Sequence, residues 1–433
     1  MKKPRGTRKS EFEEVLKLIN QVFRVNRGYE PTMEKEFPLL LAEGNIENMR
    51  IIEDGGKPVS CVNFVKRNIM INGAEISAAS IGAVCTDEEY RGNGYSSLIL
   101  DDVEDKLYED GVDLALVSGT RALYQRRGYT LTKNFIKYKV YPDEKALSFK
   151  VEEFKENDLL EIARVYNMSS TRYVRTMEDF KKLIKSGLFP WGNISYKSYV
   201  IKEKNLTVGY VFIKIQGYTD KEIGIVVEAG GKSCYIKEAL KHIGYINDLD
   251  FIEYNIHIND RINFIKDAEE KGLDYQAGSV KIINFESFME KLRPYFLQLM
   301  ESEFINEIQF NTIKGKIEKI DENTADKEVL TSTHYEGDNF NSEDKLSKGL
   351  NGFKFNVTEE ILDYIEVVDL KEKYRLIFQG EVLEIEDIRT LNKLVFEGSG
   401  NLDLNYNGSK KLKDFVETVF PIPFVYTANL NYQ

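Results

Sequence analysis

The stretch that most constrains the fold is residues 81–100, which read IGAVCTDEEYRGNGYSSLIL. An apolar run at 81–85 predicts a strand, RGNGYS follows as a glycine-rich turn, and apolar residues recur at helical spacing over 98–107. A strand that leads through such a turn into a helix gathers unpaired N–H groups, and the helix dipole adds positive potential there. This geometry favours an anion such as a phosphate. The stretch alone leaves open an ordinary strand-to-helix turn with two glycines.

The composition limits the classes of protein to which this sequence can belong. The chain has 433 residues, of which 42% are hydrophobic and 30% charged, and its net charge is −12. At about 100–200 residues per domain, this length predicts roughly two to four domains. We expect no nucleic-acid partner, because phosphate backbones require clustered Lys and Arg. The negative charge suits a cationic substrate, and it equally serves solubility.

Cysteines, histidines and apolar runs exclude further kinds of site. The three cysteines (Cys61, Cys85 and Cys234) are too scattered for a disulfide framework or a zinc site, which predicts a cytoplasmic location. The three histidines show no metal-ligand spacing either, so we expect no metal. Residues 1–14 are basic but lack the apolar region of a signal peptide. No apolar stretch approaches the ~18 residues of a membrane span.

One order of elements occurs twice along the chain. In the first copy, helices and three antiparallel strands precede the glycine turn, and a strand at 129–141 ends the series. From residue 147 the order returns at a period of about 145 residues, far longer than a solenoid repeat. In this second copy, the pattern predicts a helix at 262–271 and a closing strand at 280–284. The sequence therefore predicts a duplicated domain.

The remaining residues form a third predicted part. It begins near Phe285 with a helix that stops before Pro294, and it includes a further helix at 410–419. The most polar part, at 319–348, predicts a loop. The predicted domains are 1–146, 147–284 and 285–433.

The second copy keeps the predicted elements but loses the distinctive residues. Where the first copy reads RGNGYS, the second reads AGGKSC, without the arginine and the spacing. Its GGKS is no nucleotide-binding loop, because Val226 stands where that motif requires glycine. LYQRRGY at 123–129 corresponds to DAEEKGL at 267–273, so that Ala268 replaces Tyr124. Joint loss of both features is expected of a copy that kept its fold and dropped its active site.

These two motifs resemble those of the GNAT N-acetyltransferases. RGNGYS is similar to the R/Q-x-x-G-x-G/A loop that binds the pyrophosphate of acetyl-coenzyme A in that family, with Ser96 in place of Gly or Ala. LYQRRGY is similar to the later motif, whose tyrosine lies beside the thioester. The layout of the whole chain resembles the Eis-like (enhanced intracellular survival) acetyltransferases. The resemblance implies an α+β (mixed α/β) fold with two tandem GNAT-like domains, the second degenerate, and a C-terminal domain similar to sterol carrier proteins.

The resemblance also implies roles for single residues. Tyr124 is the general acid, since a phenol with a pKa near ~10 can protonate a departing thiolate; an aromatic ring packed under the sheet is the alternative. Nine residues contact acetyl-coenzyme A, three through their backbones along the pantetheine arm and six around the pyrophosphate: Val84, Cys85, Thr86, Arg91, Gly92, Asn93, Gly94, Tyr95 and Ser96.

The last sixteen residues, TVFPIPFVYTANLNYQ, contain no charged side chain. Such a segment is expected to pack rather than to extend into solvent. In the Eis-like group the terminal carboxylate reaches the first domain's active site. The resemblance therefore implies that the carboxylate of Gln433 helps to deprotonate or orient the acceptor amine. Packing of the tail on its own domain is the alternative, and no other base can be chosen from the sequence.

We predict from these features an acetyl-coenzyme-A-dependent N-acetyltransferase that acts on an amine of a small, cationic molecule, aminoglycoside-like or polyamine-like. A protein or peptide N-acetyltransferase is one alternative. A non-catalytic protein that binds coenzyme A, or that carries a lipid in its third domain, is another. The likeness to the Eis-like group also implies a homo-oligomer.

Overall fold

The computed structural model describes residues 2–189, 194–263, 269–292, 294–295, 299, 352–358, 361–368, 373–378 and 381–431. Within these ranges the chain forms two compact units. The first comprises Met1–Met70, Ser77–Ile283 and Pro423–Gln433, and the second comprises Ile71–Ile76 and Asn284–Ile422. Each unit has its own sheet, and the mixed α/β fold class is confirmed.

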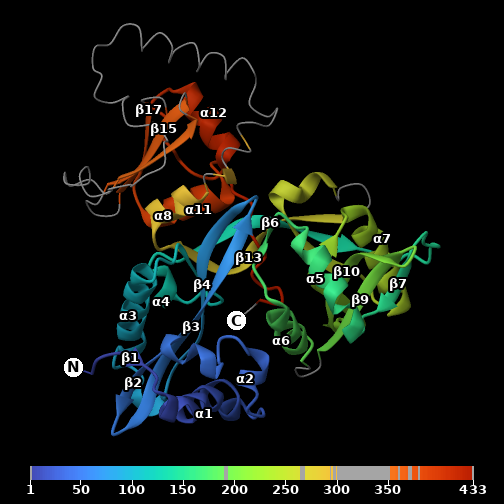
Figure 1. The fold of residues 1–433 in the computed structure, drawn as a ribbon, viewed down its shortest axis with the longest axis horizontal. Coiled ribbons are helices and arrows are strands. Elements are labelled where there is room, and N and C mark those ends of the chain that lie inside the picture. Colours follow the sequence, from blue (N-terminus) through green and yellow to red (C-terminus); the bar gives the residue numbers. More distant parts are fainter. Residues whose placement is uncertain are drawn as a thin grey trace, which may run out of the picture. The chain divides into compact units, whose positions relative to one another are not determined.

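The first half of the first unit follows the predicted order of elements (Figure 1). The strand before the glycine turn, the turn and the following helix are all confirmed. The elements are β1 (Arg5–Gly6), η1 (Lys9–Glu11), α1 (Phe12–Phe23), η2 (Val25–Arg27), α2 (Met33–Glu36), η3 (Glu43–Asn48), β2 (Met49–Asp54), β3 (Lys57–Ile71), β4 (Ala74–Thr86), η4 (Glu88–Tyr90), α3 (Tyr95–Glu109), β5 (Leu114–Val117), α4 (Ala122–Gln125) and β6 (Thr130–Val140).

The second half repeats this order, apart from its last predicted helix. Its elements are β7 (Lys150–Glu153), η5 (Glu156–Asp158), α5 (Leu159–Asn167), β8 (Thr171–Tyr173), α6 (Met177–Gly187), β9 (Ser195–Glu203), β10 (Leu206–Tyr218), β11 (Lys221–Gly231), α7 (Ser233–Ile246), β12 (Ile252–His257), η6 (Ile258–Asn263) and β13 (Glu269–Ile282).

The end of the helix predicted at 262–271 is wrong, because residues 269–271 belong to the closing strand, which is longer than predicted; residues 264–268 of that prediction lie outside the described residues. The chain leaves η6 at Asn263, and β13 begins at Glu269. Glu269 pairs with Lys139 of β6, and further pairs follow along the same strand. Cross-strand pairing therefore overrides the helix propensity of this charged stretch. Ala268, the predicted counterpart of Tyr124, lies outside the described residues.

The two halves share one 13-stranded sheet in the order β1-β2-β3-β4-β5-β13-β6-β12-β11-β10-β9-β7, and β8 pairs separately with β3. The last strands of the halves are exchanged, because β13 joins β5 and β6 joins β12. β4 and β5 pair in parallel from Ala78↔Leu114 to Ile81↔Val117. Beyond Ile81, β4 continues to Thr86 without β5. The two strands therefore part at their carboxyl ends, where ligands bind in open α/β sheets.

Apolar clusters cover both faces of this sheet. One cluster packs α3 and α4 on β4 and β5 and contains Ile81, Ile99 and Tyr124 (Figure 1). A second joins α1 of the first half with α5 and α6 of the second, around Val15 and Phe180. A third lies under α7. Helices from both halves thus meet in one core, which fixes the position of the second half beside the end of β4.

The second unit contains a four-stranded antiparallel sheet in the order β14-β15-β16-β17. Its elements are α8 (Phe285–Lys291), β14 (Gly352–Thr358), β15 (Ile361–Val368), β16 (Lys373–Phe378), β17 (Glu381–Ile385), α11 (Ile388–Glu397) and α12 (Lys410–Val419). The helix predicted before Pro294 and the one at 410–419 are confirmed. The polar segment at 319–348 lies outside the described residues. Across the described chain, every helix is too short or too polar to cross a membrane.

Candidate active site

The turn between β4 and α3 depends on two glycines with left-handed backbones. Gly92 has φ 84° and Gly94 has φ 75°. A Cβ at either position would meet no atom within 4 Å, so glycine is required there for its backbone conformation rather than for space. The turn is held from within, because Asn93 Nδ2 donates a hydrogen bond of 2.9 Å to the Tyr90 carbonyl. The sequence GNG therefore specifies the local path of the chain.

Five successive peptide N–H groups are left open by this path. Among the described residues, the N–H groups of 92–96 have no acceptor, and Ser97 is the first to donate, to the Gly94 carbonyl at 3.1 Å. Gly94 is the N-cap residue of α3 and has no side chain that could accept from these N–H groups. Residues 91–94 are also exposed. Open N–H groups at a helix N-terminus bind anions, because hydrogen bonding and the helix dipole act together. The residues predicted to bind an anion therefore lie together in one loop with open N–H groups.

Arg91 lies at the rim of the same loop. Its guanidinium is exposed and forms an ion pair with Glu88 of η4 at 3.2 Å. Exposed pairs of this kind contribute little stability, so the side chain can turn towards an anion at small cost.

A chain of hydroxyl groups ties the loop to the sheet. Thr86 Oγ1 lies 2.7 Å from Ser60 Oγ and 3.0 Å from Ser96 Oγ. Ser60 Oγ also donates to the Cys85 carbonyl at 3.1 Å. Ser96, which departs from the Gly or Ala of the GNAT motif, thus uses its hydroxyl to fasten the first turn of α3 to the end of β4. Ser60 belongs to this arrangement and was not predicted from the sequence.

The end of β4 is bent at Ala83, which has φ 47° although it is not glycine. Its carbonyl accepts a hydrogen bond of 2.9 Å from Asn63 Nδ2 of β3, and this contact holds the unfavourable conformation. Val84 then joins the cluster beneath α3, whereas Cys85 is buried in the opposite cluster with its Sγ 3.4 Å from Cys61 Sγ. The hydrogen bond with Cys61, followed by burial, raises the pKa of Cys85 and keeps it a thiol. Only the tertiary structure reveals this bend.

Tyr124 lies on α4, in the cluster beneath α3 that also contains Val84 and Tyr95. A Cβ at Gly119 would come within 2.5 Å of its ring, so glycine leaves room for the tyrosine. The ring meets Tyr129 edge-to-face, with 6.1 Å between centroids. Burial raises the pKa of Tyr124, and the Arg121 charge lowers it by a smaller amount. No described residue bonds its hydroxyl, which is therefore a protonated and available donor at neutral pH.

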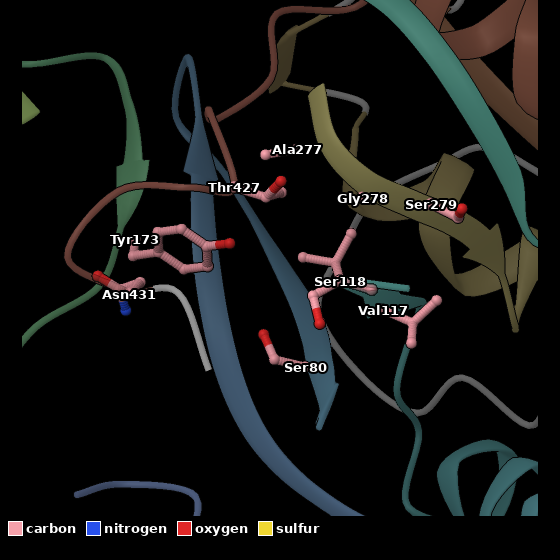
Figure 2. A pocket seen from close by; sticks show the side chains of 10 residues that line it. Ser80, Val117, Ser118, Tyr173, Ala277, Gly278, Ser279, Thr427 and Asn431 are labelled. Carbon is pink, nitrogen blue, oxygen red and sulfur yellow. The ribbon is translucent and has the colours of Figure 1, made fainter. Parts of the chain in front are cut away.

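A small hollow, half open to solvent, lies between β4, β5 and β13. Figure 2 shows the hydroxyls of Tyr173, Ser80 and Ser118 directed into a common space. Tyr173 comes from β8 of the second half, and no described residue bonds its hydroxyl. The lining residues are all uncharged: Ser80, Leu116, Val117, Ser118, Tyr173, Ala277, Gly278, Ser279, Thr427 and Asn431. The hollow therefore combines both halves with the last segment of the chain, and sequence reasoning missed Tyr173.

The segment 423–431 is packed, as its apolar composition predicted, and it belongs to the first unit. Phe424 and Leu430 are buried, and Thr427 and Asn431 reach the hollow. The alternative, packing on the third domain, is therefore wrong for this segment. Gln433 lies outside the described residues.

Comparison with known proteins agrees with this geometry. Residues 3–132 match the family model of the acetyltransferase (GNAT) domain. A GCN5-related N-acetyltransferase from Anabaena variabilis superposes with a TM-score of 0.52 and 15% identity, covering 66% of this chain and 74% of its own. A protein from Enterococcus faecalis described as a probable N-acyltransferase gives a TM-score of 0.53 and 18% identity, covering 67% and 74%. At these identities the likeness shows the fold alone.

The Eis1 protein from Mycobacterium abscessus superposes with a TM-score of 0.48 and 14% identity, covering 66% of this chain and 74% of its own. No curated protein sequence matches the chain.

Proposed function

We propose that the chain, an N-acetyltransferase by its GNAT domain, transfers an acetyl group from acetyl-coenzyme A to an amine of a small molecule. The observation that carries this proposal is the run of five open N–H groups at 92–96, at the N-terminus of a helix within the matched domain. Pyrophosphate oxygens are anionic acceptors, and these N–H groups are donors without partners, so their chemistry is complementary. When bound, acetyl-coenzyme A supplies an activated acyl group as a thioester.

Residues of the first half bind and orient the donor, acetyl-coenzyme A. The N–H groups of Gly92, Asn93, Gly94, Tyr95 and Ser96 hold the pyrophosphate, and Arg91 turns from Glu88 to add a positive charge. The backbones of Val84, Cys85 and Thr86 follow the pantetheine arm. This role agrees with the bend at Ala83, which separates that part of β4 from the neighbouring strand β5.

Tyr124 is proposed as the general acid. Its hydroxyl holds a proton throughout the neutral range, because burial raises the pKa of this phenol. It passes that proton to the departing thiolate, whose negative charge would otherwise develop in an apolar cluster. The residue acts in the first half only, where the matched domain lies.

The acceptor amine is proposed to enter the hollow in front of β4 and β5. An amine must be uncharged to attack, and a lining without a charged side chain favours the uncharged form. Any further ammonium groups of an aminoglycoside-like or polyamine-like acceptor then stay in solvent, where the net charge of −12 attracts them. The Gln433 carboxylate remains our prediction for the base, and removal of the last two residues tests it.

The test is an acceptor panel that contains polyamines, aminoglycosides and a lysine peptide, assayed with acetyl-coenzyme A by thiol release and by mass of the product. We expect acetylated small amines and slower or absent peptide acetylation. Binding of coenzyme A is measured separately by calorimetry. Failure to bind coenzyme A would overturn the donor site, and exclusive peptide acetylation would replace the acceptor class.

We propose that the second half is a degenerate GNAT-like copy, that the boundaries lie near 146 and 284, and that the predicted third domain, 285–433 without the segment 423–433 that belongs to the first unit, resembles a sterol carrier protein. A homo-oligomer is likewise proposed, and sedimentation of the full chain measures it.

A further inference from the structure

A buried ion pair occupies the second half near the hollow. Arg175 and Glu228 of β11 form two parallel hydrogen bonds, at 2.8 Å from Nη1 and 2.7 Å from Nη2. Their side chains are 0% and 8% exposed. Tyr210 also donates to Glu228 Oε1 at 3.0 Å, and the Arg175 guanidinium lies 4.2 Å from the centroid of the Tyr166 ring. Arg175 is thus held rigidly from several sides.

The third donor of Arg175 reaches the last segment of the chain. Its Nε donates to Asn431 Oδ1, a residue 256 positions later in the sequence. Asn431 is 3% exposed, and its own N–H donates to Asn429 Oδ1 at 2.7 Å. Because Asn431 lines the hollow, the ion pair is joined to the hollow through one side chain.

Other contacts fix the same segment less specifically. Leu430 packs so closely on Gly187 that a Cβ there would lie 2.3 Å from Leu430 Cδ2. Upstream, Asn255 Nδ2 donates to the Tyr426 hydroxyl at 2.6 Å, and Phe135 meets the Tyr426 ring at 5.0 Å between centroids. These contacts flank Thr427 and Asn431. The Arg175 bond is therefore the charged contact that sets the position of a lining residue.

We propose that Arg175 is a positioning residue for the acceptor: held by Glu228, it fixes Asn431 and thereby the segment 423–431 as a wall of the acceptor hollow. The inference rests on the proposed function for the identity of the hollow. Through Arg175 the second half thus contributes to acceptor binding for the reaction of the first half. Tyr173, two residues before Arg175, lines the same hollow. Residues 173–175 therefore supply one lining residue and the side chain that holds another, Asn431, in place.

The energetic reason lies in the buried charges. Removing one partner of a buried Arg–Glu pair strongly lowers the stability of the fold, because the other partner is left as an uncompensated buried charge. Because both terminal nitrogens of Arg175 are bonded to Glu228, the guanidinium keeps a fixed position. By contrast, the neutral side chain of Asn431 can be replaced without breaking the ion pair between Arg175 and Glu228. The contact of Arg175 with Asn431 can therefore be tested separately from the ion pair.

The experiment uses the full chain with Asn431→Ala, which keeps the pair between Arg175 and Glu228. We expect the KM for the acceptor to rise about 10-fold, the loss of one hydrogen bond from a charged donor, while the KM for acetyl-coenzyme A stays unchanged. Asn431→Asp keeps an oxygen acceptor for Arg175 Nε and should restore wild-type hydrogen exchange of the segment 423–431. The matched control is Asn167→Ala, because Asn167 accepts a bond of 3.3 Å from Arg172 on the exposed surface.

Hydrogen exchange of the peptide covering 423–431 gives a readout that does not depend on activity. We expect faster exchange there in Asn431→Ala and wild-type exchange in Asn167→Ala. An unchanged acceptor KM, or equal rises in both KM values, would overturn the positioning role, as would unchanged exchange. If wild type acetylates no amine, the proposed function fails, while the exchange result still decides whether Arg175 anchors the segment.

Discussion

Replacing Tyr124 with phenylalanine removes one oxygen and leaves the ring in place. The ring keeps its edge-to-face contact with Tyr129, at 6.1 Å between centroids, and the space beside Gly119 stays filled. No described residue bonds the lost hydroxyl, so the variant breaks no hydrogen bond within the described part of the chain. We therefore expect the free energy of unfolding to change by less than about 1 kcal/mol.

The effect on turnover should be far larger than the effect on stability. Loss of a general acid costs kcat about 10- to 1000-fold, which corresponds to about 1.4–4 kcal/mol of transition-state stabilisation. The KM for acetyl-coenzyme A should not change, because the N–H groups at 92–96 are untouched. The phenol must be protonated to act, and burial raises its pKa. Wild-type activity attributable to Tyr124 is therefore retained at least to about pH 10 and lost only above it.

Thiol release at saturating acetyl-coenzyme A measures kcat across pH, and urea unfolding measures stability. The matched control is Tyr129→Phe, which removes a buried hydroxyl from the same cluster without touching the proposed acid. Wild-type turnover in Tyr124→Phe, or equal losses in both variants, would refute the assignment. If Tyr124 only packs under the sheet, the phenylalanine ring fills the same space, and both turnover and stability should stay at wild-type values.

Three further predictions concern other parts of the site. Gly94→Ala forces alanine into a left-handed conformation at a cost of about 1–2 kcal/mol and should raise the KM for acetyl-coenzyme A; Gly44→Ala, whose Cβ also meets open space, is the calorimetric control. Tyr173→Phe should raise the acceptor KM several-fold and leave the acetyl-coenzyme A KM unchanged, and steady-state kinetics with both substrates varied will decide. Burial lowers the pKa of His257 from 6.5 to about 3. Between these two pH values the imidazole of His257 is therefore protonated in the unfolded chain and neutral in the folded one. Wild type should thus lose about 2 kcal/mol more stability than His257→Asn between about pH 7 and about pH 5, and equal losses in denaturant unfolding would contradict this.

Local structure could be predicted from the sequence because its causes are local. The apolar run, the two glycines and the helical spacing around Gly92 and Gly94 specify a strand, a turn and a helix within twenty residues, and the structure has all three. The same holds for α12, whose bounds agree with the predicted 410–419. At 269–271 the local helix signal failed, since pairing with β6 outweighed helix propensity there.

The sequence by itself thus determined the elements, the glycine loop and the reason for suspecting Tyr124. Only the tertiary structure decided that β6 and β13 are exchanged between the halves, that Ala83 bends β4, and that Tyr173 and Asn431 meet at one hollow. Turn conformation and helical periodicity arise between near neighbours along the chain. Arg175 and Asn431, by contrast, lie 256 residues apart, and no periodicity or spacing encodes a contact that exists only after both halves have packed.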